Sequence, residues 1–374
     1  MRQLWTAVGR KLALGLFGTV CLAALLAAAS ACAGPGYYAQ AISGHWQLMR
    51  AREQVADVLA DPATDPELAR RLRSARGLLA YAERGLDLPA DDSYSSYVET
   101  GRSAVVWNVV AAPEFSLEPR RWCFPVAGCV PYRGYFDRAG AERFAGRLRD
   151  RGLDVSVSPA TAYSTLGWFS DPLLDTMLND GELQLAATLF HELAHRRLYV
   201  KGDTAFNEAY ATFVGREGVR AWLASQEDRA RLGEWQRRLD ASDAFVRLQA
   251  RTRRQLSALY ARGLPATQAR QAKQAVFDDM LRRYRKMVTS ELDGYDAFGA
   301  WFASQPNNAD LALFHDYHAG VCAFAALFAE AGGNFHQFHR LAHDRAGWPT
   351  AQRAAWLAKP CPDTGAGIAS AGDL

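Results

Sequence analysis

The sequence predicts an α+β protein in which a unit that mixes strands and helices precedes a mainly helical unit. Residues 103–157 alternate short apolar runs rich in Val with one amphipathic segment, which is typical of a small mixed sheet with a helix against it. Beyond Gly181 apolar residues recur at helical spacing almost to the end of the chain. The length of 374 residues allows two or three domains, and the 49% hydrophobic content excludes a disordered or collagen-like chain.

The expected elements follow from apolar spacing and from turn residues. Residues 41–88 have helical spacing with a break at Asp61-Pro62, which predicts two helices. The β-rich part predicts strands at 104–110, 130–136 and 153–157, an extended segment at 113–119, and a helix at 137–151 capped by Asp137.

Two charged segments, 226–262 and 266–287, are joined at Gly263-Leu264-Pro265. They predict a helical hairpin with solvated basic faces. The alternative is a nucleic-acid-binding arm, but the arginines of both segments are interleaved with aspartates, which favours the hairpin.

The first 31 residues have the layout of an export signal. Arg2, Arg10 and Lys11 precede the uncharged run from Leu12 to Ala31, which is just long enough to span a bilayer. The run ends in Ala29-Ser30-Ala31-Cys32, which resembles the bacterial lipobox and predicts that a lipid is attached to Cys32. Plain cleavage, a retained anchor and a buried structural helix are the alternatives, and all but the last place the body outside the cytoplasm.

The net charge also separates the export segment from the rest of the chain. The chain has 43 Lys+Arg against 40 Asp+Glu, an excess of three that equals the three basic residues of the export segment. The remaining body is formally neutral. The membrane is therefore an expected partner and nucleic acid is not.

Cys123 and Cys129 are six residues apart, with Pro125 and Gly128 between them to turn the chain. Outside the cytoplasm this spacing predicts a local disulfide. Two buried thiols are the alternative, and a zinc knuckle is disfavoured because no second pair has ligand spacing. Cys322 and Cys361 permit no assignment from sequence.

The strongest motif is His191-Glu192-Leu193-Ala194-His195, within the apolar helical run 183–199. A spacing of four places both imidazoles on one helix face, where they can share a tetrahedral Zn²⁺ ion. Glu192 projects beside them and is expected to act as general base on a zinc-bound water. The alternative is a pair of structural histidines with acidic neighbours.

A catalytic zinc site needs a third protein ligand, and Asp203, Glu208 and Glu217 are the candidates. Gly202 is expected to cap the end of the zinc helix and Asp203 the start of the next. His195 and Glu208 are equidistant from this turn, so they lie level in an antiparallel hairpin. Glu217 lies about 13 Å further along the helix. We therefore expect Glu208 to be the third ligand.

At these residues the chain resembles the gluzincins, which combine H-E-x-x-H with a Glu ligand on the next helix, as in thermolysin-like peptidases and zinc aminopeptidases. The intervening segment is shorter here. A closer resemblance is to the bacterial putative aminopeptidase family of predicted lipoproteins, specific over residues 32–225 and looser beyond. This resemblance implies a zincin-like fold, one zinc ion per chain, and a peptide or protein substrate. The matching segments are 37–41, 105–134, 163–169, 191–195 and 206–208.

The mechanism of a zinc peptidase suggests further residues that bind the peptide or stabilise the tetrahedral intermediate. The segment Tyr163 to Phe169 is placed to hold a peptide as an added strand, with an aromatic core strand as an equal alternative. Tyr317, in the cluster 315–318, is a candidate donor to the tetrahedral intermediate. The acids that could bind a substrate ammonium group are Glu114, Glu118 and Asp171.

Near the end of the chain, His336, His339 and His343 recur at helical spacing and are expected to lie on a solvent-exposed helix face.

The sequence thus predicts a zinc metallopeptidase of the bacterial cell envelope, anchored by lipid and facing the periplasm, with aminopeptidase specificity through the resemblance. An envelope endopeptidase and a non-catalytic zinc-binding assembly lipoprotein are the alternatives. The presence of Glu192, which a structural zinc site does not need, favours catalysis. The expected organisation is a signal peptide at 1–31, a zincin-like domain at 32–225, a helical domain at 226–360 and a disordered tail at 361–374.

Overall fold

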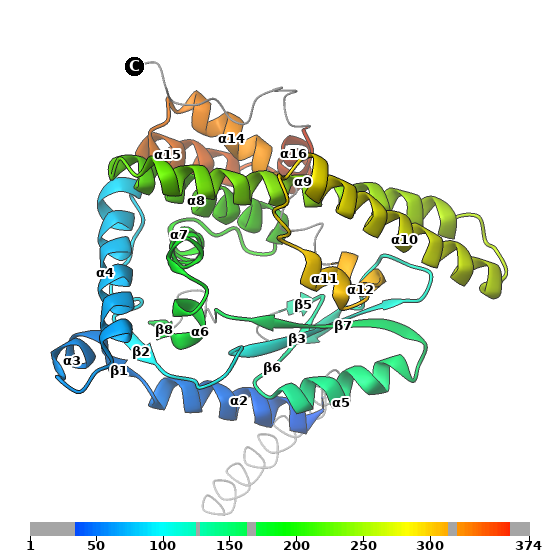
Figure 1. Cartoon of the computed structure of the whole chain (residues 1–374), viewed down its shortest axis with the longest axis horizontal. Helices are drawn as coiled ribbons and strands as arrows, with labels where there is room; N and C mark the ends of the chain where they lie inside the picture. The colour runs from blue at the N-terminus through cyan, green and yellow to red at the C-terminus, as the bar shows by residue number, and fades with distance from the viewer. Residues whose placement is uncertain (1–33, 125–127, 163–169, 313–319, 360–374) are drawn as a thin grey trace, which may run out of the picture.

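The computed structural model describes residues 34–124, 128–162, 170–312 and 320–359. It is a mixed α+β structure, as the sequence predicts. Figure 1 shows the small sheets below the long helix α8 (Thr204–Ser225) and a group of C-terminal helices above it. Within the described ranges, no helix combines the length and apolar character needed to cross a membrane.

The N-terminal region contains one more helix than expected. The predicted break at Asp61-Pro62 is confirmed, because one helix ends at Ala60 and the next begins at Pro66. A second break lies at residues 51–54, where Glu53 and Gln54 pair with a distant strand and so interrupt the helical path. The elements are α2 (Pro35–Arg50), β1 (Glu53–Gln54), α3 (Val55–Ala60) and α4 (Pro66–Leu86).

The larger three-stranded sheet has the order β6-β3-β7 and is antiparallel throughout, not mixed as predicted. The mixed sheet is the other one, β1-β2-β8, whose strands have only two or three residues. Residues 114–121 form no strand. The strands are β2 (Ser96–Val98), β3 (Val106–Pro113), β4 (Trp122–Phe124), β5 (Gly128–Val130), β6 (Arg133–Tyr135), β7 (Leu153–Ala160) and β8 (Leu173–Leu174).

The helix α5 (Arg138–Arg149) packs on the larger sheet, and its predicted cap is present. The Asp137 carboxylate accepts hydrogen bonds from the backbone N–H groups of Ala139 and Gly140. A short hairpin, β4 with β5, carries the disulfide between Cys123 and Cys129.

From Asp175 on, the described residues are mainly helical, and the charged hairpin is formed by α9 and α10, which pack against each other. The hydrophobic core is not interrupted at residue 225, where the sequence predicts a boundary between two domains. The largest apolar cluster joins Leu72 of α4 and Phe190 of α7 to Phe324 and Phe338 near the C-terminus. The helices are α6 (Asp175–Leu178), α7 (Glu182–Arg197), α8 (Thr204–Ser225), α9 (Arg229–Tyr260), α10 (Ala266–Ser290), α11 (Gly299–Ala303), α12 (Asn308–Ala312), α14 (Val321–Glu330), α15 (Phe335–Ala346) and α16 (Thr350–Leu357).

His339 on α15 is buried, which corrects the expectation of a solvated histidine face. His336 and His343 are exposed, but His339 retains only 3% of its accessible surface. Its Nε2–H donates to the Leu86 carbonyl at 2.8 Å, and its Nδ1 accepts from the Tyr210 hydroxyl at 2.7 Å. The ring therefore joins three helices: α15, α8 and the end of α4. Periodicity alone placed it wrongly, because α15 is covered on the face that carries Phe335, Phe338 and His339.

We expect His339→Ala to lower the free energy of unfolding by about 2–4 kcal/mol. The change leaves a cavity and removes partners from the buried Tyr210 hydroxyl and the Leu86 carbonyl. Urea unfolding at pH 7 measures the loss. His343→Ala, an exposed position on the same helix, is the matched control and should cost less than about 0.5 kcal/mol. Equal losses in the two variants would contradict this role.

The same side chain makes stability depend on pH. Burial lowers the pKa of His339 from 6.5 to about 4. Between these values the unfolded chain binds more protons than the folded one, so stability is lost as pH falls. Between pH 6.5 and 4.5 the wild type should lose about 2 kcal/mol more than His339→Ala.

Candidate metal centre

The site is built on two helices, α7 and α8, that pack closely. A methyl group at Gly215 of α8 would lie 2.8 Å from the Ala187 carbonyl oxygen, and one at Gly218 would lie 2.9 Å from the Phe190 ring. Both positions therefore need glycine if the helices are to approach this closely. The close approach brings the first turns of α8 within side-chain reach of His191 and His195.

The turn between these helices differs from the expected one. Gly202 is not the helix cap, because the chain leaves α7 at Leu198 in an extended conformation. Gly202 lies in the turn with φ +81°. The side chain of Asn207 holds the extended segment, accepting from the Val200 N–H at 2.8 Å and donating to its carbonyl at 2.9 Å. Asp203 caps α8 as predicted, accepting from the Phe206 N–H at 3.1 Å.

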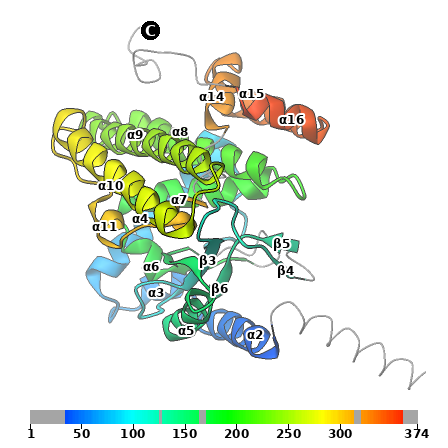
Figure 2. The same ribbon diagram turned by 90° about the vertical axis from the view of Figure 1, so that its right-hand side faces the viewer.

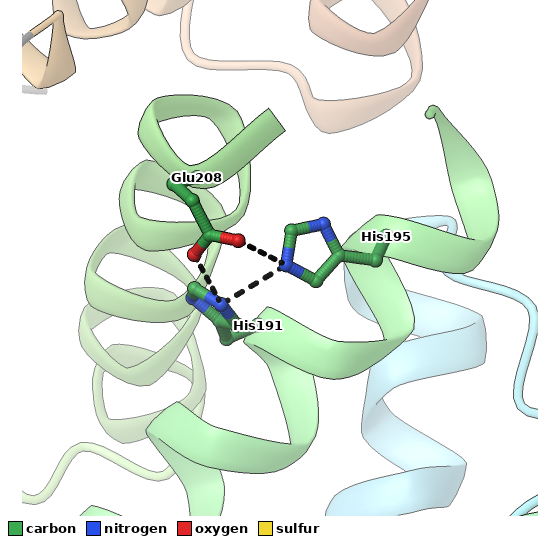
Figure 3. A group of neighbouring side chains, drawn as sticks. All are labelled: His191, His195 and Glu208. Carbon is green, nitrogen blue, oxygen red and sulfur yellow. Dashed lines mark hydrogen bonds and ion pairs between the residues drawn. The ribbon is translucent and has the colours of Figure 1, made fainter. Parts of the chain in front are cut away.

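His191, His195 and Glu208 converge on one point, as Figure 3 shows. The two histidine Nε2 atoms are 3.1 Å apart. The Glu208 carboxylate lies 3.5 Å from His191 Nε2 and 3.6 Å from His195 Nε2. The His195 side chain is 5% exposed and that of His191 22%, so the group is shielded on one side and reachable from solvent on the other.

The donor groups lie close to the separation that a zinc ion requires. Ligand atoms about 2.0–2.1 Å from a tetrahedral zinc ion lie about 3.3 Å from one another. The two Nε2 atoms are 3.1 Å apart, His191 lies 3.5 Å from one oxygen of the Glu208 carboxylate, and His195 lies 3.6 Å from the other oxygen. Two imidazoles and one carboxylate leave the fourth position open, which is the donor set of a catalytic rather than a structural zinc site.

At two of the three residues, His195 and Glu208, the pKa shift favours the form that binds a metal ion. Burial and the charge of His191 lower the pKa of His195 to about 4, so its ring is neutral near pH 7. Burial opposes ionisation of Glu208, but the hydrogen bond from His191 and the charges of both histidines outweigh it and lower the carboxyl pKa. For His191, burial is outweighed by Glu208 and Glu192, which raise its pKa. A neutral imidazole and an ionised carboxylate are the ligand forms that a metal binds.

The chain was compared with known proteins. A family described as "Putative aminopeptidase" matches residues 36–357. The chain belongs to this family. No curated protein and no solved structure gives a match. The family match extends past residue 225 through α16, so the C-terminal helices are as much a part of this aminopeptidase family's sequence as the metal centre is.

The other two candidate ligands, Asp203 and Glu217, each contact an arginine instead. Asp203 forms an ion pair with Arg353 of α16 at 2.7 Å in addition to capping α8. Glu217 lies 3.5 Å from Arg220, and burial raises its pKa. Neither belongs to the three-residue group.

Two tyrosines near the centre were not found from sequence. The pKa of Tyr94 is raised by burial and then by the charges of Glu192 and Asp171. The pKa of Tyr132 is raised by burial and then by several neighbours that include Glu208 and Glu192. Both phenols therefore lie within electrostatic reach of the H-E-x-x-H carboxylate. Tyr94 also has φ +62°, a conformation rare outside glycine. Tyr94 lies in none of the segments that resemble the family, and Tyr132 lies within 105–134 without a residue pattern that would assign it a role.

The structure separates the three acids considered for an ammonium group. Glu114 is held by Arg270 at 2.5 Å, beside the charged hairpin. Glu118 is exposed on the connection between β3 and β4. Asp171 is 3% exposed, and its charge and that of Glu192 both raise the pKa of Tyr94, so of the three acids it is the one that shares a neighbour with Glu192.

Several expectations fall outside the described residues: the strand at 163–169, Tyr317 with its cluster, Cys32 and the export segment, and the tail after residue 360. They remain predictions from sequence.

Proposed function

We propose that this chain is a zinc-dependent aminopeptidase of the bacterial cell envelope. One observation carries the proposal: the two histidines of H-E-x-x-H and Glu208 place three ligand atoms within 4.8 Å of one another, with Glu192 next to His191 on the same helix. The family's description supports aminopeptidase specificity.

His191, His195 and Glu208 would hold the zinc ion. When bound, zinc lowers the pKa of a coordinated water and polarises the carbonyl of the bond to be cleaved. Glu192 would act as the general base, accepting the proton of the attacking water and passing it to the leaving amine. Glu208 holds α8 against α7 through its contacts with both histidines and supplies the negative charge of the ligand set.

Amino-terminal specificity requires an anionic group to bind the substrate ammonium. Asp171 is our choice, because it is a buried carboxylate that shares Tyr94 with Glu192. A buried charge close to the cleavage site would favour substrates with a free α-amino group over those with an internal peptide bond.

The proposed location rests on the N-terminal sequence. Arg2, Arg10 and Lys11 followed by an uncharged run to Cys32 are typical of an exported lipoprotein. The disulfide between Cys123 and Cys129 is consistent with a compartment outside the reducing cytoplasm.

Protein that starts after Cys32 is expected to contain one zinc ion per chain and to hydrolyse aminoacyl reporter substrates. Metal content is measured by elemental analysis, and N-acetylated reporters are the matched control because they lack the ammonium group. Cleavage of internally quenched peptides alone would make the protein an endopeptidase. Zinc binding without cleavage of either substrate would instead support a binding lipoprotein.

A further inference from the structure

The lower edge of the molecule is formed by α2 and α5, and Figures 1 and 2 agree on this placement. The inner face of α2 packs on the sheet region: Gln40 bonds to the backbone of Gly134 and Phe136, and Gly44 lies against the Phe136 ring. The opposite face of α2 points away from the molecule.

That outer face carries two large apolar side chains, Ile42 and Trp46, which are 58% and 57% exposed. They are half of the four large hydrophobic side chains that are exposed in the described ranges, and they lie one helical turn apart. Arg50 lies over the Trp46 ring at 5.7 Å. A tryptophan with an arginine over its ring suits the boundary between lipid and water, where apolar and polar groups meet.

The neighbouring helix α5 adds positive charge to the same edge. Arg143 and Arg147 line a pocket of about 380 Å³ that lies between the start of α2 and α5. Arg143 has a distant partner in Asp137 at 3.6 Å, while no carboxylate in the described ranges forms an ion pair with Arg147. The other polar side chains of the pocket are Tyr37, Gln40, Arg133, Tyr135 and Asp137, so three arginines and one carboxylate line it.

The chain enters the structure at this edge, because Gly34 and Gly36 line the same pocket. The uncharged run from Leu12 to Ala31 ends only three residues before Gly34. Whether that run is retained or replaced by a lipid on Cys32, a bilayer would lie within reach of α2.

We propose that the face formed by Ile42, Trp46, Arg143 and Arg147 binds the surface of a bilayer that contains anionic phospholipid. The two apolar side chains enter the interfacial layer, and the pocket beside Arg143 and Arg147 receives a lipid phosphate. This contact is separate from the anchor at the N-terminus and does not depend on the proposed peptidase activity.

The test uses residues 34–374, so that the export segment cannot itself insert. This chain retains every described element and all four apolar clusters. Its binding to vesicles of phosphatidylcholine, alone or mixed with phosphatidylglycerol, is measured by co-sedimentation. We expect binding to the mixed vesicles that weakens with salt, and little binding to phosphatidylcholine alone.

Matched variants separate the two components. Ile42→Ser with Trp46→Ser should weaken binding roughly tenfold, while Tyr295→Ser, another exposed aromatic, should not. Arg143→Gln with Arg147→Gln should weaken it roughly tenfold, while Arg251→Gln with Arg254→Gln, two exposed arginines on α9, should change it far less. Lipids brominated near the headgroup should quench wild-type tryptophan fluorescence more than that of Trp46→Phe.

Four results would overturn the proposal. The first is equal binding to neutral and anionic vesicles, and the second is equal losses in the face variants and their controls. The third is a change in solution mass for the Ile42/Trp46 variant without a change in vesicle binding, which would make this face a contact between two copies of the chain. Glycerol 3-phosphate that competed fully with vesicles would likewise assign the pocket to a free phosphate.

Discussion

Glu192→Gln is expected to abolish peptide hydrolysis while zinc stays bound. Glutamine preserves the size of the side chain but cannot accept the proton of the attacking water, so kcat should fall on the order of a thousandfold or more. The proposed metal ligands His191, His195 and Glu208 are unchanged, and zinc content should remain at one ion per chain. Turnover of an aminoacyl reporter and elemental analysis measure the two quantities on one sample.

The matched control is Glu182→Gln, in the first turn of the same helix, where the carboxylate pairs with Arg231 at 2.5 Å. It removes the same charge from α7 far from the metal ligands and should leave kcat within about twofold. If Glu192→Gln retained wild-type turnover, Glu192 would not be the base. If it lost zinc as well, the result would indicate a structural role.

Glu208→Gln is expected to cause the second large effect, a loss of zinc affinity. Glu208 contributes the one anionic donor of the group, at 3.5 and 3.6 Å from the histidine nitrogens. Its replacement should weaken binding by more than the 10–100-fold that loss of an outer partner costs. Competition with a chelating dye measures the affinity. The rise in Tm that zinc produces in the wild type should be lost at the same zinc concentration.

Glu217→Gln is the control for this experiment. It is on the same helix and its carboxylate is also buried, but it faces Arg220 and lies outside the three-residue group. Its zinc affinity should equal that of the wild type. A Glu208→Gln protein with full zinc affinity would show that the third ligand is another residue.

The fold was predictable for long elements that are determined by neighbouring residues in the sequence. The charged segments form α9 and α10. Asp137 caps α5 and Asp203 caps α8, as the sequence predicts. The strands of two or three residues were not predictable, because β1, β2 and β8 are defined by pairing between residues distant in sequence. The burial of His339 likewise depends on α4 and α8, which no local pattern reveals.

The residues of the candidate site were likewise predictable where local sequence determines them, and not where tertiary contacts do. The pairing of His191 with His195 follows from helical spacing, and Glu208 follows from its distance to the turn, even though the turn itself differs from the expected one. The distance argument tolerates this error because α7 and α8 still run back along each other from a short connection. Tyr94 and Tyr132 come from separate segments, so only tertiary structure brings them to Glu192.

The ion pair between Asp203 and Arg353 has a consequence for the order in which the site can be completed. Arg353 is 150 residues from Asp203 in the chain and is also bonded to the Ala346 carbonyl at 3.1 Å. Because a chain is synthesised from its N-terminus, His191, His195 and Glu208 all emerge well before this arginine. The start of the Glu208 helix thus gains its last buried support only when synthesis is nearly finished, and a chain cut before α16 would carry every ligand without that support.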